Sequence, residues 1–127
     1  MLIARREFER YVEQALASIP KKYRNLFKNI SIIVEDLPSR EDAELTGVPK
    51  DELLGLFKGA ALGEGGGFFD VPIPAPNEIY LYQQNIQSAC RTEDELIREI
   101  RVTLLHEVGH YFGMTEDDLE EFEKNNQ

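Results

Sequence analysis

The chain has 127 residues, enough for one domain with a modest core and too few for two ordinary domains. With 42% hydrophobic and 30% charged residues, its composition is that of a globular protein rather than a disordered one. The formal net charge of −10 argues against nucleic acid as a partner, because a phosphate backbone would repel the chain and its basic residues form no stripe.

No apolar run approaches the roughly 20 residues that cross a bilayer, and the N-terminus is charged from Arg5 onward, unlike a signal peptide. We therefore expect no membrane association and a cytoplasmic location. The single cysteine, Cys90, cannot form an internal disulfide, which agrees with a reducing compartment. A packed thiol is expected there, because a nucleophilic cysteine would need a histidine base and both histidines have a better assignment.

The first half of the chain predicts helices followed by a strand. Residues 8–19 (FERYVEQALASI) carry apolar side chains at the spacing of an amphipathic helix, which Pro20 ends. A short helical turn is expected at residues 21–27. The β-branched run at residues 30–36 (ISIIVED) predicts a buried strand. The charged segment at residues 38–52 is typical of a loop, with room for a helical turn.

Two further strands are predicted, at residues 53–62 (LLGLFKGAAL) and 77–86 (NEIYLYQQNI). A patch rich in glycine and proline separates them at residues 63–76, and a connection of this length implies an antiparallel or mixed sheet. The patch is a candidate lid or docking loop, although burial of its Phe68 and Phe69 under the loop is the simpler interpretation.

From residue 92 the pattern becomes helical. Thr92 with Glu95 three positions later predicts a capping box, and Gly113 stands where a glycine would end the helix. Thr115 with Asp118 then opens a short terminal helix in the same way. The order is therefore two helices, three strands and two helices, which indicates an α+β fold in a single domain of residues 1–127.

Both histidines of the chain, His106 and His110, lie on the longer of these helices, with Glu107 beside the first. The two histidines project about 40° apart and one turn apart along the axis, so both imidazoles can reach one ion. Glu107 projects beside the ion, and the apolar residues of the helix occupy the opposite arc. Two imidazoles and a carboxylate that is not a ligand are what zinc-dependent hydrolysis requires.

The third ligand cannot be a histidine, because none is left. Glu116 completes the pattern His-Glu-x-x-His-x-x-Gly-x-x-Glu, with an acid where metzincins have their third histidine. Gly113 can adopt the positive φ that turns the chain back toward the metal. Asp117 is the alternative ligand, and Asp118 is expected mainly to cap the terminal helix with Thr115.

Other polar residues are weaker candidates for a role at the metal site. Glu99 lies on nearly the same helical face as His106 and is either an acceptor for an imidazole N–H or a surface carboxylate. Tyr80, Tyr82 and Arg91 are conceivable oxyanion donors, but a structural role is the simpler interpretation of each.

The segments LLGLFKG, NEIYLYQQNI, CRTEDELIREIRVTLLHE and LLHEVGHYFGMTEDDLEE resemble a family of small bacterial zincin-like metallopeptidases, the minimal zincins, formerly a domain of unknown function. The family pattern His-Glu-x-x-His-x-x-Gly-x-x-Asp implies His106 and His110 as zinc ligands, Glu107 as general base and the acid at position 116 as third ligand. Here Glu116 replaces the aspartate and is one methylene longer, which leaves Asp117 as an alternative third ligand. The resemblance also implies a compact fold with a small mixed sheet packed on the active-site helix.

Two functions fit these residues. The first is a zinc-dependent peptidase in which metal-activated water hydrolyses peptide bonds and Glu107 is the general base. The second is a metal-binding protein-interaction module that keeps the motif with little or no turnover. Its support is size, since larger zincins build the far wall of the cleft from a C-terminal subdomain and few residues follow Glu116. Zincin architecture also suggests residues 53–62 as the sheet edge along which an extended peptide substrate lies.

Overall fold

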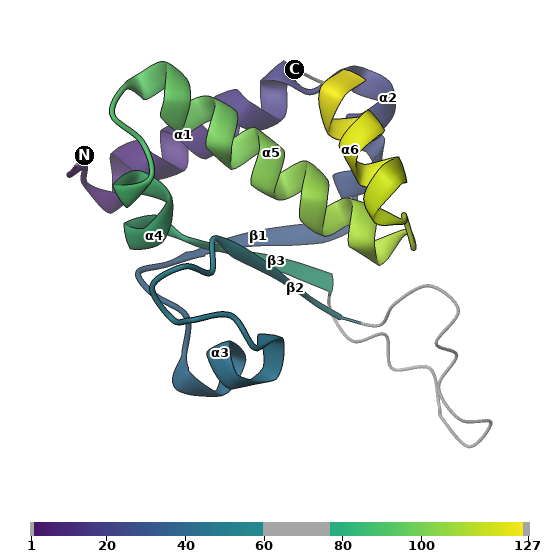
Figure 1. Ribbon diagram of the computed structural model, residues 1–127. Helices are drawn as coiled ribbons and strands as arrows, with labels where there is room; N and C mark the ends of the chain where they lie inside the picture. Colours follow the sequence, from purple (N-terminus) through teal and green to yellow (C-terminus); the bar gives the residue numbers. More distant parts are fainter. Residues whose placement is uncertain (1, 60–76, 126–127) are drawn as a thin grey trace.

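The structure is a computed structural model that describes residues 2–59 and 77–125 (Figure 1). The predicted lid or docking loop, with Phe68 and Phe69, lies outside the described residues. The elements are α1 (Arg5–Ser18), α2 (Lys21–Arg24), the 3-10 turn η1 (Asn25–Phe27), β1 (Ile30–Glu35), α3 (Arg40–Thr46), β2 (Gly55–Lys58), β3 (Asn77–Tyr82), α4 (Gln83–Ser88), α5 (Glu93–Tyr111) and α6 (Glu116–Asn125).

The three described strands form one mixed sheet in the order β1-β3-β2. β1 runs parallel to β3, and β2 runs antiparallel to it, which confirms the predicted mixed sheet. Helices α1, α5 and α6 lie on one side of the sheet and the short α3 lies on the other (Figure 1). The architecture is thus the predicted α+β fold, with an N-terminal helix and a short C-terminal helix around the long α5.

The core lies between the sheet and α5, where α1 packs across the back of α5. Most of the apolar arc predicted for α5 is buried there, whereas Phe112 at its end is 38% exposed. Cys90 is packed as expected, and burial raises the pKa of its thiol. No helix in the described ranges is long and apolar enough to cross a membrane. The fully buried side chains include Phe8, Ala15, Ile79, Leu81, Ile86, Leu96, Ile100, Leu104, Leu105 and Val108.

The strand predicted over residues 77–86 is wrong after Tyr82, because residues 83–88 form α4. Three of the polar side chains in α4 are buried and hydrogen-bonded, which the apolar pattern did not indicate. Gln83 accepts from Arg5 Nε at 2.8 Å and donates to the carbonyl of Ile3 at 2.9 Å. These bonds tie the start of α4 to the start of α1.

The segment at residues 38–52 is more helical than a loop. Ser39 caps α3 by accepting from the amide of Asp42 at 3.0 Å, and Gly47 ends it with φ of 72°. The second strand is shorter than predicted, because β2 begins at Gly55 and ends at Lys58. The end of that predicted strand, residues 60–62, lies outside the described residues.

The predicted boundaries of α5 are confirmed. Thr92 Oγ1 accepts from the amide of Glu95 at 3.1 Å, while the Glu95 carboxylate accepts from the amide of Arg91 at 2.7 Å, one residue earlier than in a standard capping box. Gly113 has φ of 73°, and the amide of Met114 bonds back to the carbonyl of Gly109 at 3.0 Å. This glycine turn directs the chain into α6.

Gly55 allows β2 to lie directly against α5. A methyl group at this position would lie 2.7 Å from Thr103 Cγ2 and 3.1 Å from the carbonyl oxygen of Tyr80. Both distances are too short for a carbon contact, so only glycine fits without displacement of the strand or the helix. The distance between β2 and α5 therefore depends on this one residue.

We expect Gly55→Ala to destabilise the fold by about 1–3 kcal/mol, the usual cost of overpacking. The second substitution Thr103→Ser removes the methyl group that the new side chain meets, so the double variant should recover part of the loss. Urea unfolding of both single variants and the double variant measures this coupling. Simple addition of the two single effects would show that the contact is not the cause.

Candidate metal centre

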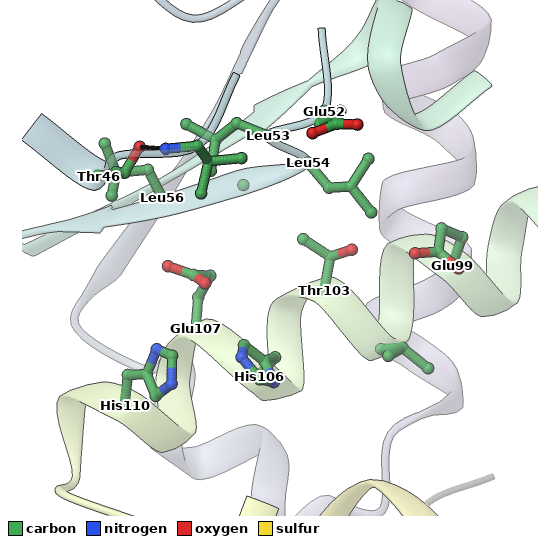
Figure 2. Close-up of a pocket in the computed structure, with 13 residues that line it drawn as sticks. Thr46, Glu52, Leu53, Leu54, Leu56, Glu99, Thr103, His106, Glu107 and His110 are labelled. Carbon is green, nitrogen blue, oxygen red and sulfur yellow. Dashed lines mark hydrogen bonds between the residues drawn. The ribbon is translucent and has the colours of Figure 1, made fainter. Parts of the chain in front are cut away.

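Helix α5 brings His106, Glu107 and His110 together on the side that faces β2 (Figure 2). One ligand atom from each residue lies within 4.8 Å of the other two. The imidazole rings meet edge to face with centroids 4.4 Å apart. Two imidazole nitrogens at this separation fit two positions of a zinc donor set, so the histidines are compatible with that metal, with the Glu107 carboxylate beside them.

The carboxylate of Glu107 is held by the backbone of β2. Its Oε1 accepts a hydrogen bond from the amide of Phe57 at 2.7 Å. In the β2–β3 ladder the amide of Tyr82 bonds to the carbonyl of Leu54, so the backbone groups of Gly55 and Phe57 point to the outer edge of the sheet. One carboxylate oxygen is thus engaged at the strand edge, and the other is left for chemistry beside the histidines.

Burial raises the pKa of the Glu107 carboxyl above its ordinary value. The Phe57 amide and the two nearby histidines oppose this shift, because each favours the charged form. The result is a carboxylate that is more basic than one in water. A carboxylate of this kind accepts a proton more readily.

The turn at Gly113 places Glu116 next to His110. Glu116 Oε1 lies 3.6 Å from His110 Nε2, and both side chains are accessible, 83% and 46% exposed respectively. Among the described residues, Glu116 is outside the group whose ligand atoms all lie within 4.8 Å. The carboxylate therefore adjoins the histidine pair without converging on it as Glu107 does.

The two neighbouring acids of α6 have other surroundings. Asp118 accepts from the amide of Thr115 at 3.1 Å, and Thr115 Oγ1 accepts from the amide of Asp118 at 3.1 Å, which forms the reciprocal capping box that was predicted. Asp117 lines a separate depression with Glu120, Glu121 and Lys124. The placement of these acids favours Glu116 as the one nearest the histidines.

A cavity of about 450 Å³ adjoins the histidines and Glu107. Glu99 also lines this cavity. The proposed oxyanion donors do not line it: Tyr80 bonds to Glu78 at 3.3 Å, and Arg91 lies at a different depression beside Cys90. Tyr82, at the end of β3, is buried, and burial raises the pKa of its hydroxyl.

A family profile for zincin-like metallopeptidases matches residues 27–125, which covers the sheet, α5 and α6. The chain belongs to the zincin-like metallopeptidase family. A comparison with curated proteins found no match. Membership confirms the resemblance inferred from the motif and supports a zinc peptidase in general.

Several groups at this zincin-like site have no signature in the motif. The Phe57 amide is a backbone group, so no side-chain pattern points to it. Thr103 and Val102, one turn before His106, line the cavity but look like ordinary helix residues. One feature of the sequence could have indicated that the strand lies close to the helix. It is Gly55 inside an apolar strand, since such a glycine often marks the close approach of another element.

We expect Glu107→Gln to stabilise the metal-free protein at about pH 8 and to lose that advantage toward about pH 4. The folded protein raises the pKa of Glu107, so its protonated form favours folding. This contribution is complete below the unfolded pKa and is lost as the pH rises through the folded one. Urea unfolding in the presence of EDTA measures the difference.

Glu120→Gln is the matched control for the loss of one negative charge, because Glu120 is exposed on α6. The same pH profile for both variants would contradict an effect of burial at Glu107.

Proposed function

We propose that residues 1–127 form one zinc-dependent peptidase domain, in which His106 and His110 bind zinc, Glu116 is the third ligand and Glu107 is the general base. The observation that carries this proposal is the convergence of His106, Glu107 and His110 within 4.8 Å beside an open strand edge. Family membership supports zinc as the metal and a peptide or protein as the substrate. A cytoplasmic location stays a prediction from the sequence.

The bound zinc would supply a Lewis acid that polarises the scissile carbonyl and increases the acidity of water. Glu107 takes a proton from the attacking water through the oxygen that Phe57 does not engage, and then delivers that proton to the departing amine. The Phe57 amide holds the carboxylate in one orientation during both transfers. The peptide C–N bond breaks as the hydroxyl of water adds to the carbonyl carbon and the proton of water adds to the nitrogen.

The edge of β2 supports the binding of an extended peptide. β2 pairs with β3 on one side, and in the described sheet no strand pairs with its other side. Beside the histidines, the outward amide and carbonyl of Gly55 and the carbonyl of Phe57 can pair with a peptide strand, while the amide of Phe57 remains bonded to Glu107. This placement agrees with the edge expected from zincin architecture, although β2 is only four residues long.

The alternative is a metal-binding interaction module that uses the same residues without turnover. It is favoured by the accessibility of His110 and Glu116, because a partner protein can reach ligands that are this exposed. The two functions share the metal ligands and differ in the need for Glu107, which makes this carboxylate the discriminating residue.

We expect Glu107→Gln to bind zinc with unchanged affinity. Its peptidase rate should fall by at least about 100-fold, because a general base usually accelerates a reaction by that factor or more. Glutamine can still accept the hydrogen bond from Phe57 but cannot take a proton. Casein and a mixed peptide library, incubated with zinc-loaded protein and analysed by mass spectrometry, provide the measurement. Zinc binding with no cleavage by the wild type would favour the interaction module.

We expect Glu116→Ala to weaken zinc binding by at least about tenfold, since even residues behind the ligands have effects of that size. Asp117→Ala is the matched control, with one acid removed from the same turn of α6. Competitive titration with a chromophoric chelator measures both affinities, and anomalous scattering at the zinc edge locates the ion. A larger loss for Asp117→Ala, or an ion nearer Asp117, would refute the assignment of Glu116.

A further inference from the structure

The cavity beside the histidines lies between α5 and the segment that connects α3 to β2. Its floor is one side of α5, from Glu99 through Val102 to His110, and its opposite side is formed by residues 46–56 (Figure 2). His106 and Glu107 line one end of it. A group that fills the cavity would therefore touch the residues proposed to cleave the peptide.

The walls of the cavity are mainly aliphatic. Val48, Leu53 and Leu54 contribute from the connecting segment, Leu56 contributes from β2, and Val102 contributes from α5. A volume of about 450 Å³ is within the range of small-ligand pockets, about 300–1,000 Å³. An apolar side chain gains by leaving water for such walls.

The charged groups at the cavity have one sign. Glu52 and Glu99 lie at the end away from the histidines, and Glu107 lies at the near end (Figure 2). An acidic side chain in this space would be repelled by Glu52 and Glu99 at the far end and would lose its hydration among the leucines. The lining thus favours an uncharged apolar occupant over an acidic one.

The connecting segment is held by α4, and the two elements that it joins are linked by an ion pair. Asn85 of α4, 6% exposed, donates through Nδ2 to the carbonyls of Lys50 and Leu53, each at 2.8 Å. Lys58 of β2 bonds to Asp42 of α3 at 2.7 Å. This wall is therefore formed before any ligand binds, which lowers the entropic cost of binding.

We infer that this cavity is a specificity pocket for an aliphatic or aromatic side chain of the substrate, next to the scissile bond, and that the segment between α3 and β2 is its second wall. The inference rests on the proposed peptidase function and names the side-chain class that the site selects. Asn85 holds this wall through its hydrogen bonds to the carbonyls of Lys50 and Leu53.

Binding to the metal-free protein tests the pocket independently of activity. The probes are N-acetyl-leucine amide and N-acetyl-aspartate amide, and the reporters are the methyl resonances of Val48, Leu54 and Val102. Leucine amide should shift these methyl groups and aspartate amide should not. The methyl groups of Leu45, 78% exposed on α3 and outside the cavity lining, are the control. Equal shifts with both probes, or none at the cavity, would overturn the inference.

Cleavage specificity tests the same pocket in the zinc-loaded protein. Mapped cleavage sites in a peptide library should show large apolar residues on one fixed side of the scissile bond. Val102→Phe fills the cavity and should move the preference toward alanine by about tenfold. Leu45→Phe makes the same kind of change outside the cavity and should leave the preference unaltered. Identical preferences in the two variants would overturn the inference.

The two experiments separate failure of the pocket from failure of the function. Cleavage without side-chain preference and without selective methyl shifts overturns the pocket and leaves the peptidase intact. Selective methyl shifts in a protein that cleaves nothing overturn the peptidase and support the apolar preference of the pocket.

Discussion

The site depends on the close contact between β2 and α5. Gly55 lets the strand lie against Thr103, and two residues later the amide of Phe57 reaches the carboxylate of Glu107. The rings of Phe57 and Tyr111 stack 4.6 Å apart and extend the contact toward the end of the helix. A side chain at position 55 would separate α5 from the sheet edge, so one missing Cβ sets the distance between Glu107 and the edge of β2.

The second constraint is the way in which the chain leaves α5. Gly113 reverses the direction of the backbone, and the Thr115–Asp118 capping box starts α6 within two residues. Gly109, between the two histidines, faces Leu119 of α6 and has no room for a side chain there. Packing therefore constrains the spacing between His110 and Glu116, because α6 docks on α5 at Gly109.

The helix boundaries and the metal motif could be predicted because their causes are local. Thr92, Gly113 and Thr115 act on backbone groups within a few residues, and the spacing of His106 and His110 is a property of a single helix. The helix α4 was missed because its buried amides, such as Asn85, are satisfied by carbonyls more than thirty residues away in the chain. Polar residues with distant partners look like surface residues in the sequence, and the wall that Asn85 holds was hidden for the same reason.

The position of that wall bears on the choice between a peptidase and an interaction module. Larger zincins build the far side of the cleft from residues that follow the third ligand. In this chain an aliphatic wall comes from residues 46–56, before the motif, and hydrogen bonds from α4 hold it opposite α5. A preformed apolar cavity beside the two histidines supports the proposed peptidase, because binding energy from a substrate side chain would orient the scissile carbonyl for attack.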